Sequence, residues 1–531
     1  MITGDNLKIK FLGILPILKK KIGFFSSQEI VAFSALLTFK GKSVERLIKE
    51  SLKKGEKVEE KIKKILRKSS LRGHASLSTT PVICFLYEGS KFLDSLLTGM
   101  YFGSFLVSSG RRTDTTPKDI VYPKKILRNK KAFGIYQSCS EKTINFYRYL
   151  CKKGIGKDVA SKILQYGIYG TGIIQLPLES FISLKREYQI EKDWMPEEAG
   201  ILIKKIEKSL KKFKADLLYN TRLIAPRNTY FYPNIFKDPK NSNLVREVSA
   251  GSNKGFKIVS LDVSLTNGLK KEILSLQKEI KKISKNKKEI KKRWYDLLLA
   301  RRKIIRDYNS SFNIKVFSSV PWRVWGEKKR HRTCPQVVES IYYSVQRTSK
   351  VFSRFRSQIK KGKINKELVE EIERVFSIPP LVKNNDEFLR NYLLVALFAF
   401  ESYNKLIKEN IAPRDAIFLI PRATKIDIVQ EYNLYNLLAG YYPLRLCQTA
   451  EEEMRRNTLG EVKAIKKLLT RKGYKWLADS IVPKCHIMGF CPEQHFCGKI
   501  RTLVKDYDEK FHQEMKEDLE NKFQKIHKSI N

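Results

Sequence analysis

Arg330-His331-Arg332, followed by seven residues and then Ser340, is the group of residues best suited to chemistry. Two guanidiniums and an imidazole form a charged fork that can bind phosphate or an electron-rich ring system. The hydroxyl of Ser340 can bind a second phosphate oxygen or the edge of a cofactor. Lys328-Lys329 precede the motif, so a basic surface run is the alternative. The spacing favours a binding site, because the chain has six histidines and a chance match is rare.

Cysteine and histidine side chains form a second group near the C-terminus. Its members are Cys485, His486, Cys491, His495 and Cys497. Thiolates and imidazoles are the ligands of tetrahedral Zn²⁺, and thiolates also hold iron–sulfur clusters. The even spacing of the cysteines is not that of a zinc finger, so isolated reduced thiols and a disulfide stay open. We expect a structural metal site that ties down a C-terminal loop.

The elements that must position these residues show signs of an internal repeat. Ile224-Ala225-Pro226-Arg227 returns as Ile481-Val482-Pro483-Lys484, at an offset of 257. Gly154 to Ala160 returns as Asn410 to Ala416, at an offset of 256. Two diverged copies of one domain, residues 1–265 and 266–531, explain these nearly equal offsets.

Each copy contains a predicted strand that follows a long charged helical stretch. Alternating apolar residues predict strands at 82–87 and 312–317, and helical spacing predicts helices at 386–409 and 449–469. Apolar residues from Ile273 to Leu297 have a heptad-like spacing with a break at Lys287. That pattern predicts a helix packed on its own domain, with an oligomerising coil as the alternative. We therefore expect an α+β fold, helix-rich with a small central sheet in each copy.

The second copy resembles the flavin-dependent thymidylate synthase family, whose signature is Arg-His-Arg, seven residues and Ser. A strand leads into that signature, and Phe312 to Trp325 fits this feature. Further family segments match at the following places: Tyr403–Leu406, Ala416–Pro421, Asn433-Leu434, Leu444-Arg445 and Ala450–Glu453. The resemblance covers most of residues 305–460.

The first copy matches the same family more faintly. Gly73-His74 with Ser76 resembles the family's flavin-contact segment. Gly99-Met100-Tyr101 holds the place of Arg-His-Arg, whereas the end of the signature survives as Ser109-Gly110-Arg111. In this family a homotetramer builds each active site from several subunits. We therefore expect one composite site from both copies, and a homodimer of tandem chains.

The resemblance implies a reductive methylation of dUMP to dTMP. FAD reduced by NADPH would drive the reaction, and methylenetetrahydrofolate would donate the carbon. The roles that it implies are catalysis by Arg330, His331 and Arg332, dUMP binding by Ser340, Arg445, Ser109 and Arg111, and flavin binding by His74, Ser76 and Asn433. The chain departs from the family pattern at Glu327, Val337, Val338 and Tyr342. A changed substrate therefore stays open.

Charge supports a second hypothesis. With 104 Lys+Arg and 55 Asp+Glu the net charge is +49, which favours polyanionic partners unless it reflects a Lys-rich composition. Gly154-Ile155-Gly156 also resembles a DNA-gripping helix-hairpin-helix. The alternative function is therefore a degenerate synthase scaffold that binds nucleic acid.

Composition excludes several classes of protein. A content of 42% apolar and 11% aromatic residues excludes disorder of the whole chain. Tyr392 to Phe400 is about the longest apolar run, too short to span a bilayer. Eight cysteines in so long a chain do not make a secreted disulfide framework. We expect a cytoplasmic protein without a membrane segment.

Overall fold

The computed structural model describes residues 2–3, 7–19, 24–54, 57–110, 113–241, 243–249, 255–264 and 266–530. The chain forms two compact units. Unit 1 comprises residues 1–243, 321–332 and 338–426, and unit 2 comprises residues 244–320, 333–337 and 427–531. Each unit draws on both predicted repeats, so the predicted boundary at residue 265 stays a prediction. None of the described helices is both long and apolar enough to cross a membrane.

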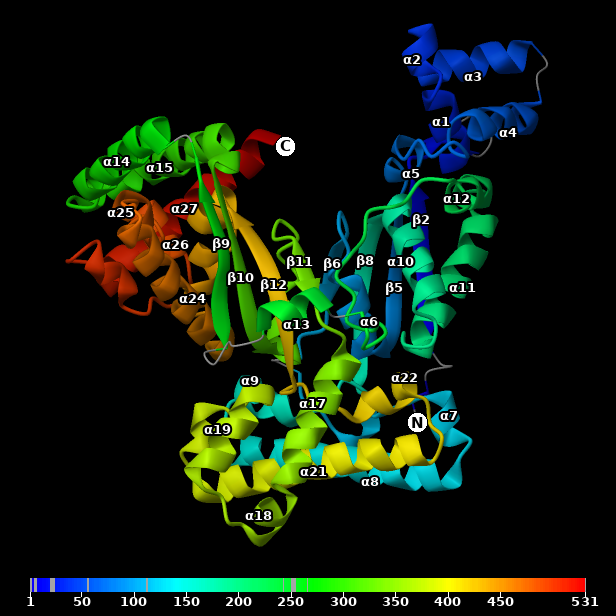
Figure 1. Ribbon diagram of the computed structural model, residues 1–531. Helices are drawn as coiled ribbons and strands as arrows, with labels where there is room; N and C mark the ends of the chain where they lie inside the picture. The colour runs from blue at the N-terminus through cyan, green and yellow to red at the C-terminus, as the bar shows by residue number, and fades with distance from the viewer. Residues whose placement is uncertain are drawn as a thin grey trace. The chain divides into compact units, whose positions relative to one another are not determined.

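Unit 1 contains a four-stranded antiparallel sheet in the order β2-β5-β8-β6 (Figure 1). Its strands are β2 (Lys8–Leu15), β5 (Val82–Ser90), β6 (Ser104–Val107) and β8 (Tyr169–Pro177). Ile83, Phe85 and Tyr87 alternate along β5 and are buried, which confirms the strand predicted at 82–87. Two short strand pairs accompany the sheet: β1 (Ile2–Thr3) with β7 (Val121–Tyr122), and β3 (Leu18–Lys19) with β4 (Phe24–Phe25).

Helices make up most of unit 1. They are α1 (Ser27–Ser34), α2 (Leu37–Lys40), α3 (Val44–Lys53), α4 (Val58–Lys68), α5 (Ser76–Thr79), α6 (Lys91–Leu97), α7 (Lys124–Leu127), α8 (Lys130–Lys152), α9 (Lys157–Ala160), α10 (Leu178–Ile190), α11 (Glu197–Lys212), α12 (Asp216–Leu223), α16 (Trp322–Lys328), α17 (Ile341–Arg354), α18 (Arg356–Lys361), α19 (Lys366–Val375), α20 (Pro380–Lys383), α21 (Asp386–Lys408) and α22 (Pro413–Ala416), with 3-10 turns at Pro117–Asp119, Ser161–Ile163 and Ile417–Leu419. The two longest, α8 and α21, pack side by side (Figure 1). The helix predicted at 386–409 is confirmed as α21.

Unit 2 holds most of a second four-stranded sheet, in the order β11-β12-β10-β9. Its strands are β9 (Phe256–Val263), β10 (Phe312–Pro321), β11 (Gln336–Val338) and β12 (Lys425–Asn433). Strand β10 confirms the strand predicted at 312–317. The helices are α13 (Asn243–Ser249), α14 (Thr266–Ile283), α15 (Lys287–Tyr308), α23 (Tyr442–Arg445), α24 (Glu452–Arg471), α25 (Lys475–Ala478), α26 (Lys484–Met488) and α27 (Glu509–Ile530), with short turns at Asn309–Ser311, Asn436–Gly440 (the π-helical turn η6) and Lys499–Thr502.

The heptad-like stretch forms two helices, α14 and α15, that pack on each other. The break falls at 284–286, where the side chain of Asn286 caps α15 by accepting from the Lys288 N–H. Ile273, Leu276 and Leu297 are buried within unit 2. The apolar stripe therefore packs on its own unit, as predicted for a structural helix.

The two halves of the chain share one order of elements. Strand order β2-β5-β8-β6 in the first sheet matches β9-β10-β12-β11 in the second. From α8 to β8, and from α21 to β12, every helix, 3-10 turn and strand has the same bounds at an offset of 256. The equivalent caps Asn129 and Asn385 both accept a backbone N–H with their side chains.

Candidate active site

Arg330-His331-Arg332 follows directly on α16 and lies within unit 1. The guanidinium carbons of Arg330 and Arg332 are 5.6 Å and 5.1 Å from the ring centre of Phe105 in β6. Arg332 also donates to the backbone carbonyl of Gly103. Guanidiniums bind aromatic faces through their charge and their planarity. The motif of the second predicted repeat therefore contacts the strand that follows the equivalent place in the first.

A buried polar network lies next to this contact. The carboxylate of Asp94 accepts from the hydroxyl of Tyr87 and from Nζ of Lys91, the latter at 3.1 Å. Lys91 Nζ also donates to Ser108, and Lys329 Nζ donates to the Asp94 carbonyl at 2.9 Å. Burial lowers the pKa of both lysines, and Asp94 opposes that shift. The network fixes the end of α6 against the motif.

Arg422 is a further cation beside this network. It was not predicted from the sequence, because the segment that resembles the family, Ala416–Pro421, ends one residue earlier. Its side chain is 2% exposed, and its guanidinium lies 5.0 Å from the Tyr166 ring centre. Nε donates to the Gln165 carbonyl at 3.2 Å, whereas Nη2 has no hydrogen-bond partner among the described residues. A Cβ on Gly110 would lie 3.0 Å from Nη1. Burial lowers the pKa of Arg422 to about 10.

Positive charge dominates the surroundings of the motif. The cations that influence one another here are Lys91, Arg323, Lys329, Arg330 and Arg422. Arg330 reaches solvent, yet loss of water at its guanidinium lowers its pKa, with Asp94 opposing. Glu327 departs from the family pattern, but it is buried and lies 3.5 Å from Arg323, so its charge is matched. The remaining positive field suits a dianionic phosphate.

Ser340 lies immediately before α17 and is fully buried. Its hydroxyl donates to the Lys237 carbonyl at 2.6 Å. Tyr342 is buried too, and its hydroxyl donates to the Trp194 carbonyl. Of the other departures, Val338 is buried and Val337 is exposed. The contact of Ser340 is structural, so its predicted dUMP role stays a prediction.

Ser109 is half-buried, and it lies beside Gly110 and therefore near Arg422. Its carbonyl accepts from the N–H of Thr113 at 3.2 Å. Arg111 lies outside the described residues. The structure thus brings the Ser109 segment close to the cationic group, while the predicted contribution of Arg111 is untested.

The predicted flavin-contact segment is exposed at the start of α5. His74 and Ser76 both reach solvent. Gly73 has φ +90°, and a Cβ there would lie 2.5 Å from Cβ of Arg227, so the turn requires glycine. The two predicted flavin residues are thus presented on a tight, packed turn.

Asn433 and Arg445 belong to unit 2, so their place in the same site stays a prediction. The side-chain oxygen of Asn433 accepts from the backbone and side chain of Asn436, at 3.1 Å and 2.9 Å. Asn436 in turn bonds to Thr333, the residue after Arg332 in the chain. Arg445 ends α23 and is half-buried. Asn433 is therefore tied to the segment that continues the Arg-His-Arg motif.

The predicted metal site is not formed as expected. Among the described residues no three His, Cys, Asp or Glu side chains lie together in a way that could hold a single metal ion. Nε2 of His486 lies 3.0 Å from the Lys499 carbonyl, and His495 is exposed. Both imidazoles are thus outside any such group.

The thiols of this region nevertheless lie near one another. Burial, together with the neighbouring thiols of Cys447 and Cys497, raises the pKa of Cys485 to about 12 and that of Cys491 to about 11. All eight cysteines are free thiols. Cys447 was missed by the sequence analysis, since it precedes the cluster by almost forty residues.

Comparison with known proteins finds sequence similarity to one family over part of the chain. Residues 265–469 match the sequence profile described as thymidylate synthase complementing protein. Flavin-dependent thymidylate synthases of Pyrococcus horikoshii and Pyrococcus abyssi are 34% and 30% identical over 127 and 126 residues, which is 24% of this chain. The chain spans about half the length of these relatives, 51% and 50%.

Among solved structures, a UMP/dUMP methylase PolB from Streptomyces cacaoi, bound with 5-Br dUMP, aligns with 43% of this chain and 100% of its own. The TM-score is 0.33 at 10% identity. The profile match spans the Arg-His-Arg signature at residues 330–332. Residues 265–469 of this chain are therefore similar in sequence to the flavin-dependent thymidylate synthases.

Proposed function

We propose that this protein is a flavin-dependent thymidylate synthase that methylates dUMP to dTMP. Its active site would combine the motif of the second repeat with the first repeat. The observation that carries the proposal is the contact of Arg330 and Arg332 with Phe105, beside the buried cations Lys91 and Arg422. The cations come from both repeats, and they lie together within unit 1.

The dUMP phosphate is the ligand that these residues fit. Arg422 offers a buried Nη2 without a partner among the described residues, and a Cβ at position 110 would lie 3.0 Å from its Nη1, so glycine leaves room beside the guanidinium. An oxyanion there would satisfy that donor and balance the local positive charge. Arg330 and Arg332, which contact the Phe105 ring, would position the base and the flavin.

FAD, reduced by NADPH, would supply the hydride chemistry, and methylenetetrahydrofolate the carbon. His74, Ser76 and Asn433 are the proposed flavin contacts, with Ser109, Arg111 and Arg445 as the proposed dUMP contacts. Ser340 is left out of this proposal because its buried hydroxyl donates to the Lys237 carbonyl. The chain's own part is binding, orientation and charge balance. The buried network anchors Lys329, the residue immediately before Arg330.

Reciprocal backbone hydrogen bonds support the proposed tandem duplication, and with it the composite site. Within unit 1, Gly167 N–H donates to the Phe418 carbonyl at 3.1 Å, and Ala423 N–H donates to the Lys162 carbonyl at 2.9 Å. At an offset of 256 these two bonds are reciprocal, as in a symmetric dimer interface. Gln165 pairs with Pro421, its own equivalent. We infer that two copies face each other in one chain, and that a homodimer of chains would complete a pseudo-tetramer.

The experiment is the visible absorption spectrum of the full chain with FAD, recorded before and after dUMP is added. A bound flavin whose spectrum shifts with dUMP is expected. Arg111→Ala should abolish the dUMP shift as fully as Arg330→Ala, whereas Arg148→Ala, on the exposed side of α8, should retain it. A silent Arg111→Ala would refute the composite site. A colourless protein with salt-sensitive DNA binding would favour the nucleic-acid alternative.

For the C-terminal thiols we propose an iron–sulfur cluster, with Cys447 as the fourth ligand beside Cys485, Cys491 and Cys497. Lys499 Nζ donates to the Leu446 carbonyl at 2.8 Å and so ties the loop after Cys497 to Cys447. A [4Fe–4S] cluster binds one thiolate at each of its four irons, and therefore needs wider thiol spacing than a single ion.

Iron and acid-labile sulfide, measured after anaerobic purification, test this cluster. Both should be present in the unmodified chain and in Cys84→Ser, whose thiol lies in β5, and both should be lost in Cys447→Ser. Zinc without iron, or no metal at all, would refute the proposal.

A further inference from the structure

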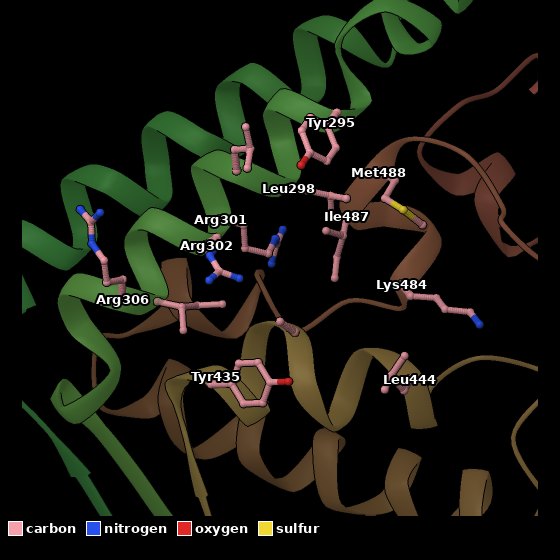
Figure 2. Close-up of a pocket in the computed structure, with 13 residues that line it drawn as sticks. Tyr295, Leu298, Arg301, Arg302, Arg306, Tyr435, Leu444, Lys484, Ile487 and Met488 are labelled. Carbon is pink, nitrogen blue, oxygen red and sulfur yellow. The ribbon is translucent and has the colours of Figure 1, made fainter. Parts of the chain in front are cut away.

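A cavity of about 700 Å³ lies within unit 2, between α15, the turn η6 with α23, and α26 (Figure 2). Cavities of this size accommodate small organic molecules. Aliphatic side chains and the thioether of Met488 form much of the lining, and Tyr295 and Tyr435 add two aromatic rings. Tyr295 is 55% and Leu444 42% exposed, so these large side chains are left open to a ligand.

The environment of Arg301 indicates that the cavity suits an anionic ligand. Its side chain is 4% exposed, and Nη1 donates to the Leu438 carbonyl at 3.2 Å. Nε has no hydrogen-bond partner among the described residues. Burial lowers its pKa to about 10, and no carboxylate opposes that shift. A buried cation without a counter-charge is costly, and an anion in the cavity would remove that cost.

Three further cations reach the cavity, and they differ in their partners. Arg306 pairs with Asp307 at 2.6 Å, and Lys484 pairs with Glu493. Arg302 has no ion pair among the described residues. Figure 2 shows Arg301 and Arg302 on the side of α15 that faces Tyr435. The cavity therefore combines two uncompensated guanidiniums with aromatic and aliphatic walls.

We propose that this cavity binds a small aromatic anion, a flat ring system that carries a carboxylate, sulfonate or phosphate group. The anionic group pairs with Arg301 and Arg302, because a guanidinium fork matches an oxyanion in geometry and charge. The ring system lies among Tyr295, Tyr435 and Met488, whose faces and thioether attract aromatic surfaces. The site is separate from the cationic group of unit 1, and it shares no residue with it.

The test titrates the full chain with anilinonaphthalene sulfonate and, in parallel, with phenylnaphthylamine, which has the same rings without the charge. Arg301→Met keeps the side-chain volume and removes the guanidinium. We expect it to weaken sulfonate binding at least about tenfold, the effect of losing a charged hydrogen bond. Binding of the uncharged probe should stay unchanged. Lys303→Met, exposed on the same helix and outside the lining, should keep both affinities.

Several outcomes would overturn the proposal. These are no saturable sulfonate binding by the unmodified chain, equal affinity in Arg301→Met, or equal loss of both probes. Displacement of the sulfonate by decanoate more strongly than by naphthoate would assign the cavity to an alkyl anion instead. If Arg301→Met does not fold, the exposed Arg302→Met takes its place. Neither dUMP nor flavin is used, so the result is independent of the proposed function.

Discussion

Residues 130–177 and 386–433 have the same secondary structure at a constant offset of 256, yet they carry different charges. Asn129 and Asn385 cap equivalent helices, and the long helices pack on each other. Tyr166 in the first stretch stands where the second has Arg422. Capping and burial constrain both stretches alike, because both must fold. The composite site that we propose needs each phosphate-binding cation only once, which would leave the charges free to diverge.

The largest expected effect concerns Arg422, which stands where the first stretch has Tyr166. Arg422→Met keeps the side-chain volume but removes the donor that we assign to phosphate. We expect dUMP affinity to fall roughly 100-fold, the upper range for a charged hydrogen bond. Deoxyuridine, which lacks the phosphate, should bind the variant as it binds the unmodified chain. Isothermal titration with both ligands measures the difference.

Arg148→Met is the matched control for this prediction, since Arg148 is an exposed arginine on α8. It should leave dUMP affinity unchanged. Equal loss of dUMP and deoxyuridine in Arg422→Met would mean that the variant distorts the site, and no loss would remove Arg422 from it. Either result would contradict the proposal that Arg422, a cation present in only one of the two stretches, binds the dUMP phosphate.

The next effect concerns the junction between strand and helix that precedes the motif in each half. Ser90 caps α6, and its N–H and hydroxyl donate to the buried carboxyl of Glu198. The equivalent residue before α16 is Pro321, which has no N–H to satisfy. Burial raises the pKa of Glu198 to about 7 from an ordinary 4.5. Glu198 in the first half is therefore protonated below a pH of about 7, whereas Pro321 in the second half has no N–H that would require such a carboxyl partner.

Between these two pKa values the folded chain binds a proton that the unfolded chain releases. The stabilising effect is complete below the unfolded pKa, falls as pH rises toward about 7, and then levels off. The fall is about 3 kcal/mol at 1.4 kcal/mol per pKa unit. Glu198→Gln should remove this slope. Thermal unfolding midpoints across that pH range measure it, and an unchanged slope would assign the proton elsewhere.

Local patterns were sufficient for the elements and for the motif. Alternation predicted β5, helical spacing predicted α21, and the Arg-His-Arg signature was visible from three adjacent residues. The proximity of Arg422 to Lys91 and Asp94 was not predictable from the sequence. It depends on the pairing of residues 162–168 with 418–424. Cys447 was missed for the same reason, since the distance along the chain hides its proximity to Cys485.

Ser109 and Ser340 are equivalent by sequence but differ in environment. Ser109 is half-buried next to Gly110, whereas Ser340 is fully buried on the Lys237 carbonyl. Ser109→Ala should weaken dUMP binding about tenfold through one lost hydrogen bond to phosphate. Ser340→Ala should lower stability by about 1 kcal/mol and leave dUMP affinity unchanged. Titration and urea unfolding of both variants separate the roles. A reversed pattern would restore Ser340 to the dUMP site.

The smallest effect tests whether the backbone of the two halves is interchangeable. Gly154 and Asn410 end α8 and α21 at the same offset, with φ +85° and +59°. Glycine and asparagine are the residues that tolerate this left-handed cap. Gly154→Asn should therefore shift the unfolding free energy by less than about 0.5 kcal/mol, and Gly154→Val by more than about 1 kcal/mol.

A Cβ at Gly154 meets no atom within 4 Å, so the φ angle alone separates these two variants. Urea midpoints of both variants, compared with Asn410→Gly, give the measurement. Equal losses in Gly154→Asn and Gly154→Val would show that the first turn differs from the second in more than its side chain. Because Asn410 already adopts the left-handed conformation at the equivalent place, the asparagine variant recreates an arrangement that the same chain contains.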